Sequence, residues 1–243
     1  NAFEANSLYQ KIREVFLMGS ILANSILDRA ATVLQDITNV RWPRKELAKW
    51  LDDGQREIVL MKPEANVTNA SYRLIAGTKQ AIPDGSVSYI QQGTSTLLPN
   101  GIQLIDVVRN MGTTTAPTPG RAISVVDKRI LNSQNREWHM DTASAEVVHF
   151  VFNEFDPKHY YVYPPQPTSN QGYIEIVYSS APVDVRKKGG GGLDAEEPSD
   201  VATITLDDIF ANVLLDYVLY RAYSKDANYA GNAERARAHM AAF

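Results

Sequence analysis

The carboxy-terminal stretch 205–243 constrains the fold most, because it carries two helical patterns in succession. Thr205 and Asp208 have the spacing of a helix capping box, and apolar residues then recur at helical spacing. The stripe comprises Leu206, Ile209, Phe210, Val213, Leu214, Tyr217 and Val218. A stripe this broad has to be buried against another element, so the stretch predicts a helical partner elsewhere in the chain.

A polar break at 224–226 separates this helix from a second one with a narrow face of small residues. That face comprises Ala227, Ala230, Ala233, Ala236 and Met240. Small side chains allow another backbone to come close. We therefore expect the first helix to belong to the subunit core and the second to contact a neighbour or another protein.

The amino-terminal third supplies a partner for the carboxy-terminal helices. Residues 41–63 read as a helix with Pro43 in its first turn, Pro63 after its end and Trp42 and Trp50 as packing anchors. Its stripe comprises Leu47, Leu51, Gly54, Ile58 and Met61. A glycine inside a helix costs about 1 kcal/mol relative to alanine, so Gly54 predicts a helix that crosses at close range.

An earlier helix is expected to begin near Asn24 or Ser25 and to end at Asn39. Its stripe comprises Ile26, Ala30, Val33 and Ile37.

The middle of the chain has a different character, with short apolar runs separated by Pro, Gly, Asn and Thr. Such runs are typical of strands. They cover 72–75, 87–90, 102–109, 147–152, 160–163 and 173–178, with 153–158 as a hairpin connection and 164–167 as a block to further pairing. One short helix, 127–138, is expected to be capped by Asp127.

These patterns predict an α+β fold in which both chain ends form a helical bundle around an inserted β-rich, sandwich-like region. The expected parts are an arm at 1–20, helical halves at 21–65 and 201–243, the β-rich region at 66–185 and a flexible loop at 186–200. The loop contains RKKGGGG followed by acidic residues, a composition that keeps a segment solvated. The arm carries Leu8, Ile12 and Val15, and could clasp a neighbouring subunit.

Composition excludes several classes of function. The chain has 243 residues, no cysteine and a net charge of −4, which argues against disulfides, thiolate chemistry and a main task of neutralising phosphates. No apolar run is long enough to span a membrane. The tetraglycine at 189–192 lacks the lysine and the strand–turn–helix context of a phosphate-binding loop.

No catalytic motif stands out, and we expect no catalytic, cofactor-binding or metal site. Two alternatives stay open at this point. A hydrolase could use His139, Asp141 and His149, whose spacing does not fit the usual helical metal motif. A receptor- or glycan-binding tail component could use the aromatic residues Trp138, Tyr160, Tyr161 and Tyr163.

Two long stretches, 26–65 and 205–243, resemble the adaptor proteins of tailed bacteriophages, the head-to-tail connectors similar to tail tubular protein A of short-tailed phages. GIQLIDVVRNMG (101–112), RAISVVDKRILNSQNREWH (121–139), HYYVYPPQP (159–167) and IEIVYSSAPVDV (174–185) resemble that family too. The similarity covers the chain from about residue 25, but neither 1–20 nor 86–97.

The resemblance implies a structural virion protein without enzymatic activity or cofactor. Such a protein, assembled in the host cytoplasm, forms a ring of identical subunits, typically twelve, between the portal and the tail nozzle or another tail protein, and lets DNA pass. We expect the last helix to reach toward the portal through Arg235, Arg237, His239, Met240 and Phe243. We expect Arg186, Lys187 and Lys188 to reach a neighbour, the tail or DNA.

Overall fold

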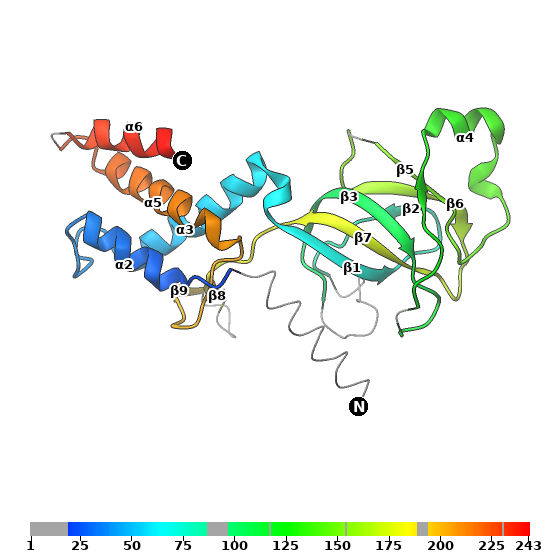
Figure 1. Cartoon of the computed structure of the whole chain (residues 1–243), viewed down its shortest axis with the longest axis horizontal. Helices are drawn as coiled ribbons and strands as arrows, with labels where there is room; N and C mark the ends of the chain where they lie inside the picture. The colour runs from blue at the N-terminus through cyan, green and yellow to red at the C-terminus, as the bar shows by residue number, and fades with distance from the viewer. Residues whose placement is uncertain (1–18, 87–96, 117, 154, 189–193, 230) are drawn as a thin grey trace. The chain divides into compact units, whose positions relative to one another are not determined.

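A computed structural model describes residues 19–86, 97–116, 118–153, 155–188, 194–229 and 231–243. The chain divides into two compact units (Figure 1). One unit combines the two ends of the chain, up to Asn66 and from Pro182 onward, and the other is the continuous segment Val67–Ala181. The fold is therefore α+β, with a β-rich region inserted between two helical halves, as the sequence predicts.

Among the described residues, four α-helices build the helical unit: α2 (Ala23–Val33), α3 (Arg44–Met61), α5 (Ala211–Lys225) and α6 (Asn232–Ala242). The 3₁₀ turns η1 (Pro63–Ala65) and η3 (Asp208–Phe210) follow α3 and precede α5. Helix α5 packs against α2, α3 and α6, so it is the central helix of the unit. Its buried residues are Ala211, Leu214, Tyr217, Val218, Leu219, Ala222 and Tyr223. The expectation that the first carboxy-terminal helix belongs to the core is confirmed.

The predicted close crossing at Gly54 is confirmed. A Cβ atom added to Gly54 of α3 would lie 2.9 Å from Cδ1 of Tyr217 and 3.3 Å from Cδ2 of Leu214, both on α5. Trp42 and Trp50 are also buried, and the indole of Trp42 donates a hydrogen bond to the carbonyl of Ala222 on α5. The two ends of the chain are therefore joined through one tightly packed helix pair.

Hydrogen bonds also join the two ends of the chain within the helical unit. The Asp208 carboxylate accepts hydrogen bonds from the backbone N–H groups of Ser20 and Ile21, and from the Ser20 hydroxyl. These donors, with the Ser20 hydroxyl foremost, lower the pKa of Asp208. Buried Gln55 accepts a hydrogen bond from the backbone N–H of Thr205 at 2.8 Å.

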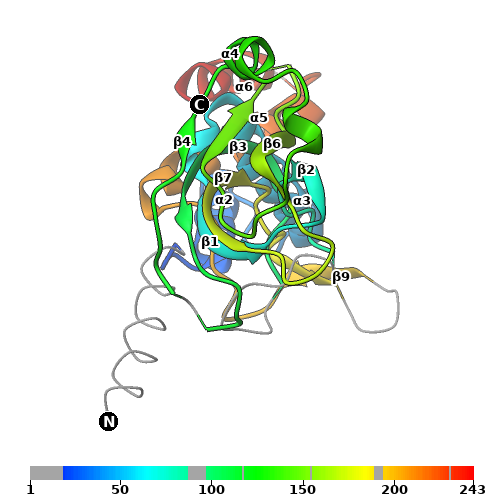
Figure 2. The ribbon, with the colours of Figure 1, turned by 90° about the vertical axis from the view of Figure 1, so that its right-hand side faces the viewer.

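The described strands of the β-rich unit form two mainly antiparallel sheets (Figure 2). The first has the order β1 (Val67–Arg73), β7 (Tyr173–Ser180), β3 (Gly101–Asn110). The second has the order β2 (Gly77–Ala81), β6 (His159–Gln166), β5 (His149–Phe152), β4 (Ser124–Val125). Only the short β4 runs parallel to its partner among the described strands.

Both sheets contribute to one hydrophobic core, so the unit is a sandwich. The central strand β7 directs Ile174, Ile176 and Tyr178 into it, all fully buried. Strand β6 supplies Tyr160 and Val162 from the opposite sheet. Helix α4 (Lys128–Gln134), capped by Asp127 as predicted, and the 3₁₀ turn η2 (Trp138–Met140) form a separate small cluster around buried Trp138.

Three sequence-based expectations about helices are wrong. Helix α2 ends at Val33 because Gln35 adopts a left-handed φ of 55°, so Val33 and Ile37 are exposed rather than part of the buried stripe. Neither Asn24 nor Ser25 caps α2, whose cap position is Leu22. Ile209 is 75% exposed because it lies in the η3 turn rather than in a regular helix.

The expected capping and break residues of the carboxy-terminal helices also differ. Asp207, not Thr205, caps the η3 turn by accepting a hydrogen bond from the backbone N–H of Ile209. The Thr205 hydroxyl instead donates to the carbonyl of Val183. Helix α5 continues through Lys225, so the break begins at Asp226. Met61 is 61% exposed at the end of α3.

In the β-rich unit, β6 continues to Gln166 and so extends into the predicted block at 164–167. Pro165 has no N–H to donate, but its carbonyl accepts a hydrogen bond from the N–H of Ser144, so pairing does not need the missing donor. Strand β2 was not predicted, because its sequence GTKQA has no alternating apolar pattern. The strand expected at 87–90 lies outside the described residues.

The segment 186–200, expected as a flexible loop, contains paired strands at both ends. Strand β8 (Arg186–Lys188) pairs antiparallel with β9 (Asp194–Pro198). The tetraglycine 189–192 lies outside the described residues, as do residues 1–18 of the expected arm.

Candidate assembly site

The five residues expected to face the portal all lie on or directly after α6, and three of them contact α5 within the subunit. His239 Nδ1 lies 2.9 Å from an Asp216 carboxylate oxygen, and the imidazole stacks on the ring of Tyr223. The Phe243 ring lies 4.9 Å from that of Tyr217. The Arg235 guanidinium lies over the Tyr223 ring at 5.7 Å. These contacts hold α6 against α5.

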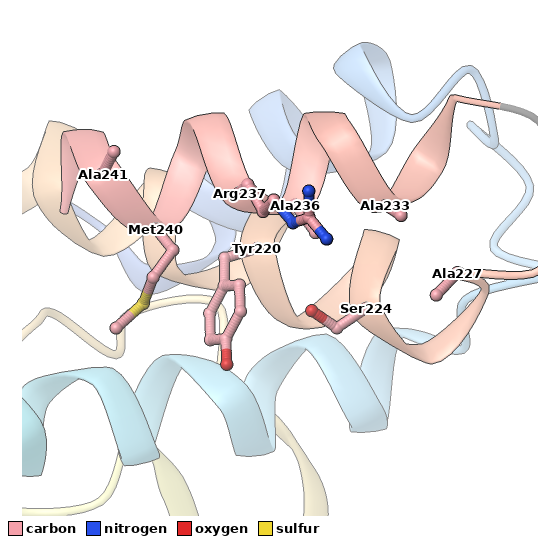
Figure 3. A pocket seen from close by; sticks show the side chains of 8 residues that line it. All are labelled: Tyr220, Ser224, Ala227, Ala233, Ala236, Arg237, Met240 and Ala241. Carbon is pink, nitrogen blue, oxygen red and sulfur yellow. The ribbon is translucent and has the colours of Figure 1, made fainter.

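Arg237 and Met240 instead line an open groove of about 430 Å³ between α5 and α6, which we name the α5–α6 groove (Figure 3). Its lining comprises Tyr220, Ser224, Ala227, Ala233, Ala236, Arg237, Met240 and Ala241. Four alanines make the groove apolar and keep it open. Of the small-residue face expected from the sequence, Ala227, Ala233, Ala236 and Met240 line this groove, and Ala230 lies outside the described residues.

A second open groove, of about 570 Å³, follows the exposed side of α2, and we name it the α2 groove. Its lining comprises Leu22, Asn24, Ser25, Asp28, Arg29, Thr32, Val33 and Leu215. Asp28 is 66% exposed although it pairs with Arg44, and Arg29 binds the side chain of Asn212. Apolar Leu22 and Val33 are nearly half exposed at its ends.

The loop between α2 and α3 presents large apolar side chains on a well-ordered turn. The Asp36 carboxylate accepts hydrogen bonds from the backbone N–H groups of Trp42, Val40 and Arg41 at 2.8–3.0 Å. These bonds, with that from Trp42 the strongest influence, lower the pKa of Asp36. The turn they fix exposes Ile37 and Val40 by about four-fifths of their surface. The turn therefore holds two exposed apolar side chains in a fixed conformation.

The base of the β8–β9 hairpin is tied to α3 by a buried carboxylate. Asp52 has a fully buried side chain, which accepts hydrogen bonds of 2.7 Å from the backbone N–H of Val185 and from Nε of Arg186. Burial raises the pKa of Asp52, and the hydrogen bond from Arg186 opposes that rise. A second ion pair joins Arg56 to Asp184 next to it.

The contact with Asp52 gives Arg186 a different role from the one expected from the sequence. Its guanidinium is engaged within the subunit, so it positions the hairpin rather than extending from it. Lys187 and Lys188 follow on the β8 backbone, and their side chains lie outside the described part of the chain.

The residues considered for a hydrolase have separate partners. His139 bonds to the Thr78 hydroxyl, His149 to the Ser124 hydroxyl, and Asp141 accepts hydrogen bonds from Asn135 and Tyr163. Burial lowers the pKa of His139. Within the described ranges, no three His, Asp or Glu side chains cluster closely enough to hold a metal ion.

The aromatic residues considered for glycan binding do not form an exposed platform. Trp138 and Tyr160 are fully buried. Tyr161 and Tyr163 pack edge-on against Trp138 at centroid distances of 6.1 and 6.4 Å. Trp138 and Tyr160 are thus core residues, and Tyr161 and Tyr163 are partly buried, so the four do not form one sugar-stacking surface.

A comparison with known protein families shows which family the chain belongs to. Residues 22–243 match the SU10 adaptor protein family. The chain belongs to this family. The match covers both helical halves and the inserted β-rich region, and it supports a bacteriophage adaptor, a structural component of the virion. No curated protein matches the chain. None of the adaptor's described helices is long and apolar enough to cross a bilayer.

Sequence reasoning missed the α2 groove, the Asp36 turn and the Asp52 anchor. The adjacent carboxylates Asp52 and Asp53 differ in their environment, because α3 buries the first and leaves the side chain of the second about one-third exposed. The position of Asp52 directly after Leu51 in the predicted apolar stripe was the available signal. The groove and the turn depend on where α2 ends, which the sequence pattern placed too late.

Proposed function

We propose that this adaptor forms a closed ring, of twelve subunits, between the portal and the tail of a phage particle, in the manner of tail tubular protein A of short-tailed phages. The family match over residues 22–243 is the observation that carries the proposal. The helical unit supports it, because it exposes two separate grooves and an apolar turn on one subunit. A ring of identical subunits needs two different contact surfaces on each copy.

We propose α6 as the helix that contacts the portal. Arg235 and Arg237 lie two positions apart and therefore on roughly opposite sides of the helix. Arg235 is exposed on the side that carries His239, and its guanidinium, 5.7 Å from the Tyr223 ring, would meet a partner that covers this side. The β8–β9 hairpin, positioned by Arg186, would present Lys187 and Lys188 to a neighbour, to a tail protein or to DNA.

The ring would be a passive conduit for DNA, without enzymatic activity or cofactor, and it would assemble in the host cytoplasm. The net charge of −4 per chain suits this role, because many cationic contacts with phosphates would hold the DNA in place. Tight, salt-sensitive binding of duplex DNA by the ring, or a lumen lined mainly by Lys and Arg, would contradict the conduit.

Portal contact is tested with purified adaptor and portal by electron microscopy and co-sedimentation. The Arg235→Glu variant should lose portal binding at least tenfold and keep the mass of the wild-type ring. Arg136→Glu, the same charge change at an exposed position of the β-rich unit, is the matched control and should bind the portal normally. Equal portal binding by the wild type and both variants would remove α6 from the portal contact.

A further inference from the structure

We propose that the two grooves of the helical unit bind each other: the α2 face of one copy lies in the α5–α6 groove of the next. This inference rests on the proposed ring and specifies its subunit contact. It assigns Arg237 and Met240 to the neighbouring subunit rather than to the portal. The occupant of the α5–α6 groove is thus a second copy of this chain.

The positions of the grooves on α5 fit a head-to-tail contact. Leu215 lines the α2 groove, whereas Tyr220 and Ser224 line the α5–α6 groove. At about 100° per residue, Leu215 points roughly 140° away from Tyr220 and about 180° away from Ser224. Helices α2 and α6 accordingly pack on α5 from different sides (Figure 1). Two unlike surfaces on opposite sides of one helical unit generate a heterologous contact, which can close into a ring.

The two surfaces also match in length. Helices α2 and α6 each have 11 residues, so each is roughly 16 Å long. The exposed stripe of α2 carries the charged Asp28 and Arg29 in its middle, small Ser25 and Thr32 on either side of them, and Leu22 and Val33 at its ends. The α5–α6 groove is lined by four alanines together with Tyr220, Met240 and Arg237, so a neighbouring helix can approach its backbone closely and meet one cation there.

Charge is complementary across the proposed contact. Arg237 is exposed and has no ion pair with any described residue. Asp28, in the α2 groove, is 66% exposed and shares its one pairing partner, Arg44, with the side chain of Asn24. Placing Arg237 beside Asp28 of the next copy would give the groove's single charged residue a counterion.

Cysteine cross-linking tests the contact directly, because the chain contains no cysteine. Thr32→Cys and Ala241→Cys place a thiol on an exposed position of each surface. With a flexible bis-maleimide, neither single variant should cross-link. An equimolar mixture of the two should give dimers only, and the double variant should give a ladder of higher oligomers.

Dimers from either single variant would show a symmetric contact and overturn the inference. A ring of normal mass in which the double variant forms no ladder would overturn it as well, while leaving the proposed ring intact. Failure of the wild type to form any oligomer, alone or with portal, would instead overturn the proposed function.

A charge exchange supplies an independent readout. Arg237→Glu should weaken self-association at least tenfold in light scattering, and adding Asp28→Lys should restore most of that loss. Arg44 keeps its hydrogen bond to Asn24 in the exchanged variant, so the fold of α2 should be retained, as checked by circular dichroism. Unchanged association of Arg237→Glu would contradict the contact.

Discussion

The junction between the two ends of the chain can be tested by adding one methyl group to Gly54. In a helix, Gly→Ala ordinarily gains about 1 kcal/mol. Here the new Cβ would lie 2.9 Å from Cδ1 and 3.2 Å from Cγ of Tyr217. These atoms are at the base of a buried ring, which cannot swing away as the end of a flexible chain could. Overpacking of this kind costs about 1–3 kcal/mol, so we expect a net destabilisation of about 1 kcal/mol.

A matched pair at Lys49 separates the two contributions. Lys49 is exposed on the same helix, so the difference between Lys49→Ala and Lys49→Gly measures helix propensity without packing. Urea unfolding followed by tryptophan fluorescence reports on the helical unit through Trp42 and Trp50 and on the β-rich unit through Trp138, so the variants at Gly54 and Lys49 should shift only the part of the signal that comes from the helical unit. Suppose that Gly54→Ala raises the free energy of unfolding by as much as Lys49→Ala exceeds Lys49→Gly. That result would refute the close crossing.

Three further variants test particular contacts. Asp52→Ala should cost about 3 kcal/mol, because it removes the buried acceptor of the Val185 N–H and of Arg186 Nε, and Asp52→Asn should cost less. Because burial raises the pKa of Asp52, the contribution of this carboxyl to stability should increase as the pH falls through the raised pKa. The lowered pKa of Asp36 means that its carboxylate stabilises the fold above about pH 4 and that this stabilisation is lost as the pH falls through the folded-state pKa. Asp36→Asn should abolish this loss in acid unfolding curves. Asn110→Ala should destabilise the β-rich unit by about 2 kcal/mol in urea, because the Asn110 side chain hydrogen-bonds both the N–H and the carbonyl of buried Val147. A cost near zero would show that water replaces the Asn110 side chain.

Much of the helical unit was predictable because its largest contacts follow from local periodicity. Leu47, Leu51 and Ile58 recur on the face that α3 buries, and the glycine within that stripe indicated a close crossing. The pattern failed at Ile37, since the left-handed turn and the Asp36 hydrogen bonds that end α2 are not encoded as hydrophobic periodicity.

Contacts between residues far apart in sequence were not predictable in the same way. Asp52 meets Arg186 across 134 positions, and neither residue's neighbours indicate the other. The grooves likewise arise from how α2 and α6 pack on α5, which depends on tertiary structure rather than on a motif. The site residues expected on α6 were placed on the correct helix, but their division between the contact with α5 and the α5–α6 groove required the structure.

The mass and rotational symmetry of the particle, alone and with purified portal, test the central claim most directly. Electron microscopy with class averaging and light scattering measure both on the full chain. The account predicts a closed ring with one subunit number, twelve, seated coaxially on the portal. A monomer that persists at high concentration and ignores the portal would contradict it.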